Sequence, residues 1–65
     1  MNTYNILIKD IYTAEKRSET VISEDTTDIR EIHKRAFKKT KTYEEIECIK
    51  NDGKIVYTYD RGFLI

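Results

Sequence analysis

Few side chains in this sequence are of types that catalyse reactions. His33 is the only histidine and Cys48 is the only cysteine, and their spacing places neither beside a partner group. General acid–base and nucleophilic catalysis both need such a pair, in which a base is held against a second group. We therefore interpret His33 as a half-buried helix residue and Cys48 as an inert core thiol. We expect a protein that is not an enzyme.

Side-chain sets that bind metals or cofactors are also missing from the sequence. Glu44, Glu45 and Glu47 are close together, but in a strand Glu44 would point away from the other two. One histidine and one cysteine are too few for a classical zinc site. The sequence has no glycine-rich loop of the kinds that hold phosphate. We predict no metal and no cofactor.

The distribution of charge is more informative. The chain has 12 basic and 12 acidic residues, yet residues 30–41 contain six basic side chains and one acidic one. Residues 1–29 carry a net charge of −3 and residues 42–65 carry −2, so a patch of +5 lies between them. Charge separated in this way offers a docking place for an anionic partner. The candidate binding residues of this patch are Arg30, Lys34, Arg35, Lys38, Lys39 and Lys41.

Three interpretations of the basic patch remain open. Lys34, Lys38 and Lys41 follow helical spacing and would form one row, which could bind an acidic protein or the phosphates of a nucleic acid. The third interpretation is a solvated helix face, for which lysine is well suited. The sequence pI of 6.6 argues against a dedicated nucleic-acid binder, since such domains usually exceed a pI of about 9.

The elements that must position these residues belong to one domain, residues 1–65. A chain of this length buries about 60% of the surface that its unfolded form exposes, so its core is thin. The sequence has no apolar run near the ~20 residues that span a bilayer, and no basic, apolar leader at its start. One unpaired cysteine is typical of a reducing compartment. We expect a cytoplasmic protein that does not bind membranes.

The strongest local pattern predicts a helix over about 27–40. Asp28 and Glu31 fit a capping box at its start, although Asp25 or Thr26 could cap it one turn earlier. The apolar positions share one stripe, which is expected to anchor the helix to the core. They are Ile29, Ile32, Ala36 and Phe37. Because Phe→Ala in a packed core costs roughly 3–5 kcal/mol, Phe37→Ala is expected to leave the chain largely unfolded.

Strands are predicted on both sides of the helix. Alternating β-branched and aromatic residues indicate strands at about 3–12 and 19–23, and further strands at 44–50 and 54–59. The stretch 42–47 could instead begin as helix. The predicted class is α+β: an antiparallel sheet of about four strands with one helix packed on one face, in the order β-β-α-β-β.

The Asn51-Asp52-Gly53 turn sets the expected register of the second hairpin. A three-residue loop would place Ile49 opposite Ile55 and Cys48 opposite Val56. Ile46, Cys48 and Val56 would then face the helix. The other face would carry a candidate surface for binding or self-association, formed by Ile49, Ile55, Tyr57 and Tyr59. The opposite register, which buries the tyrosines, remains an alternative.

Together these patterns favour a small non-catalytic binding module. The expected partner is an acidic protein, or a second copy in a homodimer. The chain resembles the small accessory regulators or inhibitors that phages and other mobile elements encode, by its size and its lack of a catalytic pair. The alternative is an accessory protein that binds nucleic acid through the basic helix at 30–41.

Overall fold

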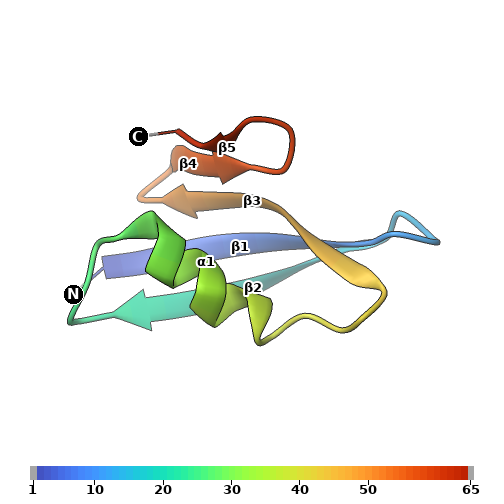
Figure 1. The fold of residues 1–65 in the computed structure, drawn as a ribbon, viewed down its shortest axis with the longest axis horizontal. Helices are drawn as coiled ribbons and strands as arrows, with labels where there is room; N and C mark the ends of the chain where they lie inside the picture. Colours follow the sequence, from blue (N-terminus) through green and yellow to red (C-terminus); the bar gives the residue numbers. More distant parts are fainter. Residues whose placement is uncertain (1, 65) are drawn as a thin grey trace.

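The computed structural model describes residues 2–64 and shows a five-stranded antiparallel sheet with one helix on one face (Figure 1). The strand order across the sheet is β2-β1-β3-β4-β5. The α+β class and the single helix are confirmed within these residues. The sheet has one more strand than predicted, a short one near the end of the chain. The elements are β1 (Asn2–Asp10), β2 (Lys16–Ser23), α1 (Ile29–Phe37), β3 (Glu44–Asn51), β4 (Lys54–Thr58) and β5 (Gly62–Phe63).

The connection between β1 and β2 occupies residues 11–15, earlier than the predicted strands at 3–12 and 19–23 imply. The Asp10 carboxylate ends β1 early because it accepts hydrogen bonds from the backbone N–H groups of Tyr12 and Thr13, at 2.8 and 3.0 Å. Ala14 adopts a φ of 64°, which reverses the chain. β2 can therefore start three residues before its predicted position and pair with β1 along its whole length.

The helix begins as its capping signal predicts and ends earlier than expected. The Asp28 side chain accepts a hydrogen bond from the Arg30 N–H at 3.0 Å, which confirms Asp28 as the N-cap. Glu31 does not complete the capping box, because the Asp28 N–H donates to the Thr26 hydroxyl instead. After Phe37 the backbone tightens into a turn, and the segment 38–41 lies beyond the helix.

The core lies between α1 and the sheet. From α1 it receives Ile29, Ile32 and Ala36, as predicted. Phe37 is 60% exposed, so its predicted place among the core residues that anchor the helix is wrong. Nine residues make only about two and a half turns, and the last of them lies on the flank of the helix rather than under it. The sheet contributes the rest of the core, namely Tyr4, Ile6, Ile8, Val21, Ile46, Ile49 and Val56.

The predicted register of the second hairpin is wrong by one residue beside the loop, where Lys50 pairs with Ile55. Farther from the loop the difference is two residues, so that Ile49 pairs with Tyr57 rather than Ile55. Asp52 and Gly53 both have positive φ, at 53° and 80°, which is the geometry of a two-residue hairpin loop. Asn51 is consequently the last residue of β3 and pairs with Lys54.

Two irregularities decide which side chains of this hairpin face the helix. On β3, the pairing with β1 skips Glu47, so Ile46 and Ile49 are both buried although they are three residues apart. Cys48 pairs with Leu7 and turns to the face away from α1, which corrects its predicted core position. A second irregularity, at Val56 on β4, leaves Ile55 exposed.

The four residues of the predicted hairpin surface do not share a face. Ile49 is fully buried and Tyr57 packs against the core under α1, whereas Ile55 lies opposite Lys50 on the other side of the sheet. Tyr59 is exposed beyond the end of β4. β4 is also not an outer strand, because β5 pairs with it. Within residues 2–64 we find no helix with the length and apolar character to cross a membrane.

Candidate functional site

The six predicted basic residues fall into three groups with different surroundings. Arg30 and Lys34 lie on α1 and Lys38 forms its C-cap, and all three are exposed. None of the three has an ion-pair partner among the described residues. Arg35 is held in a network of side chains. Lys39 and Lys41 follow the end of the helix and do not continue its rows.

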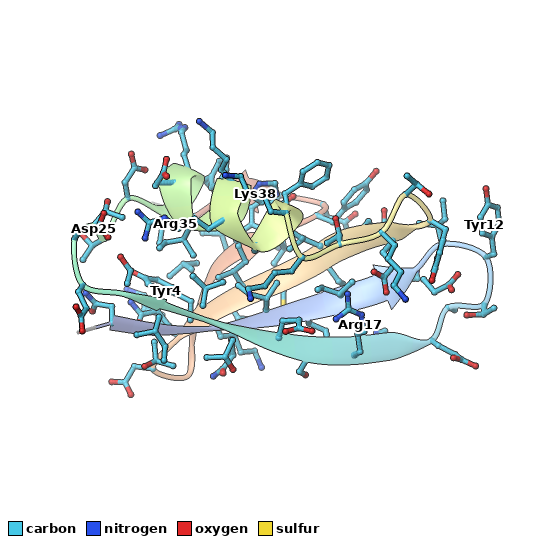
Figure 2. The ribbon with its side chains drawn as sticks, turned by 90° about the horizontal axis from the view of Figure 1, so that it is seen from below. Tyr4, Tyr12, Arg17, Asp25, Arg35 and Lys38 are labelled. Atoms are coloured by element: carbon cyan, nitrogen blue, oxygen red, sulfur yellow. The ribbon has the colours of Figure 1, made fainter. Side chains whose placement is uncertain are left out.

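Arg35 serves the structure. Its guanidinium donates to both carboxylate oxygens of Asp25, at 3.1 and 2.9 Å, and lies 3.5 Å from Glu31. The hydrogen bonds from Arg35 and from the buried Ser23 hydroxyl lower the pKa of Asp25 to about 2. Arg35 therefore ties α1 to the segment that follows β2 (Figure 2), and its charge is already compensated.

The turn after α1 is positioned by Arg17 of β2. The Arg17 guanidinium donates to the carbonyl of Lys39 at 2.8 Å and to both carboxylate oxygens of Glu44. Glu44 also accepts a hydrogen bond from the Lys41 backbone N–H, at 2.9 Å. The side chains of Lys39 and Lys41 remain exposed, with the Lys41 ammonium 5.8 Å from the Tyr43 ring centroid.

Aromatic rings adjoin the first group of basic residues. His33 lies edge-on to Tyr57 at 4.7 Å and to Phe63 at 5.7 Å, measured between ring centroids. On its other side His33 stacks with the exposed Phe37 at 6.5 Å. The Arg30 guanidinium lies 5.1 Å from the centroid of the Phe63 ring, a cation–π contact. Arg30 is thus fixed against the rings while its charge stays free for a partner.

The two titratable rings of this cluster are neutral near pH 7. Burial lowers the pKa of His33 below its usual 6.5. Burial also raises the pKa of the Tyr57 hydroxyl, and the nearby Tyr59 and Glu45 raise it further. The positive charge of the surface therefore comes from the arginine and lysine side chains alone.

We call this set the basic–aromatic surface, and it combines free cations with partly exposed rings on one flank of α1. It can hold a carboxylate against the cations and an apolar side chain against the rings. Its members are Arg30, His33, Lys34, Phe37, Lys38, Tyr57 and Phe63.

The sequence predicted the basic half of this surface and, of its aromatic half, only Tyr57 as a binding residue. His33 is half-buried, as predicted. Phe63 was not assigned to a binding surface, because the two-residue strand β5 that carries it has no sequence pattern of its own. The glycine at position 62 was the available signal in the sequence, because glycine readily adopts positive φ and so allows the chain to reverse. Its φ is 75°, and the reversal returns Phe63 to the sheet.

The remaining reactive side chains are not brought together. His33 lies on the helix side of the sheet and Cys48 on the other. Glu44 is bound by Arg17, and Glu47 lies 2.9 Å from the Lys16 ammonium. No cluster of three His, Cys, Asp or Glu residues that could hold a metal ion occurs within residues 2–64.

A hollow of about 510 Å³ lies near the β3–β4 pair, apart from the basic–aromatic surface. Its lining mixes acidic and basic groups, including Glu45, Glu47, Lys9 and Arg61. Such a mixture selects no single class of ligand. The chain matches no protein-family model, no curated protein and no solved structure.

Proposed function

We propose that the chain is a small non-catalytic binding module that docks on an acidic segment of another protein through the basic–aromatic surface. The observation that carries this proposal is the position of Arg30, Lys34 and Lys38. These three cations have no ion-pair partner among residues 2–64. Arg30 lies against the Phe63 ring, and Lys34 and Lys38 directly follow the ring residues His33 and Phe37 in the sequence. Cations that are not already compensated attract an acidic partner and orient its approach.

The aromatic rings support a protein partner in particular. Phe37 is 60% exposed and Phe63 is partly buried, so both retain surface that an apolar side chain could cover. Arginine and aromatic residues are enriched in the centres of protein interfaces. An acidic segment that also carries apolar residues would meet both features of the surface.

Nucleic acid is the second candidate. Lysine and arginine neutralise phosphates, and aromatic rings stack on bases. The equal numbers of basic and acidic residues in the whole chain, and the pI of 6.6, favour the protein partner.

The proposal also includes the compartment in which the protein acts and the kind of effect it has on its partner. The single free thiol, Cys48, supports action in the cytoplasm. The proposed role is that of a regulator or inhibitor of the accessory type that phages and mobile elements encode. The protein would act by covering a surface of its partner.

The test is binding to a labelled peptide that is rich in Glu and contains Phe, measured by fluorescence anisotropy. We expect Lys34→Glu with Lys38→Glu to weaken the binding by about tenfold. Two attractive contacts of roughly 0.2–1 kcal/mol each would be replaced by repulsion of similar size. The matched control is Lys50→Glu with Lys54→Glu, which makes the same change of charge at exposed positions of β3 and β4.

Two further measurements complete this test. Phe37→Ala should also weaken the binding while leaving the thermal transition close to that of the wild type, because the ring is mostly exposed. Equal weakening by the two double variants would show dependence on net charge alone and would contradict the proposed site. Binding of single-stranded DNA without binding of the peptide would favour the second candidate.

A further inference from the structure

β2 is an outer strand of the sheet, and no described residue pairs with its outer side. It pairs with β1 along its whole length, from Lys16 to Ser23. The opposite edge of the sheet is β5, which has only two residues. Very short edge strands resist the addition of another strand, whereas a long one presents a row of unpaired backbone groups. Figure 2 looks at this long edge, with β2 in front.

The ladder between β1 and β2 identifies the free backbone groups. The Asp10 N–H donates to the Glu15 carbonyl at 2.8 Å, and these residues lie in the same register as the pair Ile8–Arg17. Hydrogen-bonded and non-hydrogen-bonded pairs alternate in an antiparallel ladder. The odd-numbered residues of β2 therefore bond to β1. The backbone groups that point outward belong to Lys16, Ser18, Thr20 and Ile22.

From Thr20 to Ser23 this edge lacks the features that usually protect an outer strand. The chain has no proline, and the β1–β2 ladder runs without a bulge. Lys16 and Arg17 lie at one end of β2 and are engaged with Glu47 and Glu44. The other half of the strand is open, and Ile22 is 57% exposed.

Positive charge overhangs the edge on the helix side. The C-terminal end of α1 and the 38–41 turn extend past β2 (Figure 1). The hydrogen bond from Arg17 to the Lys39 carbonyl fixes the turn there. Its exposed side chains Lys38, Lys39 and Lys41 have no ion-pair partner among the described residues.

The free edge of β2 and the basic 38–41 turn together indicate which kind of segment would bind here. Side chains of an added strand would alternate, so that one set meets the 38–41 turn and the other adjoins Ser18, Thr20 and Ile22. The first set would be acidic and the second β-branched or apolar. Glu19, the acidic residue of β2 on the helix side, is already bound by Arg17 and repels the first set only weakly. A second copy would not supply the acidic set, because the helix-side residues of its own β2 include Arg17 and the buried Val21 beside Glu19.

We propose that β2 accepts an extended segment of a partner protein as a sixth strand, with acidic side chains at alternate positions facing the 38–41 turn. β-branched side chains lie between them on the other face. Main-chain hydrogen bonds supply the affinity in this mode of recognition, and the alternating side chains supply the specificity. The acidic nature of the partner rests on the proposed function, whereas the mode of binding is inferred from the free edge of β2.

Amide hydrogen exchange with a peptide of alternating Glu and Val tests this mode. With the peptide at about 100 times its Kd, exchange of the outward amides of Ser18, Thr20 and Ile22 should slow by about a hundredfold. The amides of Arg17 and Glu19, which already bond to β1, should change less. A peptide of the same composition with all Glu residues before all Val residues is the control and should give much weaker protection.

Thr20→Pro provides a second readout, because it removes one outward N–H and leaves the β1 ladder intact. We expect it to weaken the binding of the alternating peptide about tenfold. If the variant does not fold, the exchange pattern of the wild-type protein still decides.

Three outcomes would overturn the inference. If peptides perturb only α1 and leave the β2 amides unchanged, the proposed function stands and the strand addition fails. The same holds if the Glu- and Phe-containing peptide binds and the alternating peptide does not. Concentration-dependent protection of the β2 amides without any peptide would assign the edge to a second copy.

Discussion

Tyr4 is a core residue whose side chain carries a polar group. It is fully buried on β1, between the sheet and α1 (Figure 2), where its ring joins the apolar cluster. Its hydroxyl oxygen has no hydrogen-bond partner among residues 2–64. A buried polar group without a partner costs roughly 1–3 kcal/mol of stability. The ring therefore stabilises the fold while the hydroxyl opposes it.

Tyr4→Phe should raise the free energy of unfolding by about 1 kcal/mol, because it removes the unpaired hydroxyl and keeps the ring. Urea denaturation at neutral pH measures the change. Tyr12→Phe is the matched control: Tyr12 is 81% exposed, so its hydroxyl is hydrated in both states and its removal should have little effect. A loss of stability in Tyr4→Phe would mean that the hydroxyl is satisfied in solution.

At the scale of elements, α1 is short and depends on its first turn. It has nine residues, fewer than an isolated helix needs to be stable in water. Packing of Ile29, Ile32 and Ala36 holds it to the sheet, and Asp28 satisfies one of the N–H groups that the first turn leaves free.

Replacement of the N-cap tests this dependence. Asp28→Ala should lower the free energy of unfolding by about 1 kcal/mol, since the Arg30 N–H loses its acceptor. Asp28→Asn should retain most of the stability, because asparagine caps helices about as well as aspartate. Chemical denaturation of both variants gives the comparison. Equal losses would indicate that the charge of Asp28 matters more than its hydrogen bond.

Apart from β5, the strands and the helix could be predicted from the sequence, but the register of the second hairpin could not. Alternation along 4–8 and the capping signal at Asp28 depend on neighbouring residues, and both predictions agree with the structure. The turn at Asn51-Asp52-Gly53 is compatible with a loop of two or three residues, and one residue of difference reverses every side chain of a strand. The bulges at Glu47 and Val56 arise from pairing with other strands, so local sequence carries no sign of them.

The same limit applies to the candidate site. The free cations Lys34 and Lys38 could be found from charge alone, whereas Arg35 could be assigned to the structure only once Asp25 was seen beside it. Phe37 fits the apolar stripe by spacing, but the early end of α1 leaves it on the surface. Exposure of this kind depends on where the helix ends, which is set by the turn that follows.

At the scale of the whole molecule, two ion-pair networks connect segments that are distant in sequence. Arg17 joins β2 to Glu44 of β3 and to the turn after α1. Arg35 joins α1 to Asp25. Hydrogen bonds from these arginines lower the pKa of Glu44 from 4.5 to about 2, and that of Asp25 from 3.8 to about 2. Both carboxylates therefore remain charged in the folded protein well below the pH at which they take up protons in the unfolded chain.

These shifts predict how stability depends on pH. Below pH 4.5 the unfolded chain binds protons at Glu44, and below 3.8 at Asp25, before the folded protein does. Their contribution is therefore complete above pH 4.5 and is lost as the pH falls toward 2. Glu44→Gln should be less stable than the wild type at pH 7, and the difference should shrink as the pH approaches 2. Urea denaturation at a series of pH values measures both curves.

Glu24→Gln is the matched control for the acid range. Glu24 is exposed and has no ion-pair partner among the described residues, so its variant should follow the wild-type curve throughout. Glu44→Gln should have the flatter curve, because one of the two shifted carboxylates is gone and only Asp25 still titrates with a lowered pKa. An equally steep loss of stability between pH 4.5 and 2 in Glu44→Gln and the wild type would show that the link from β2 to β3 through Arg17 does not stabilise the fold.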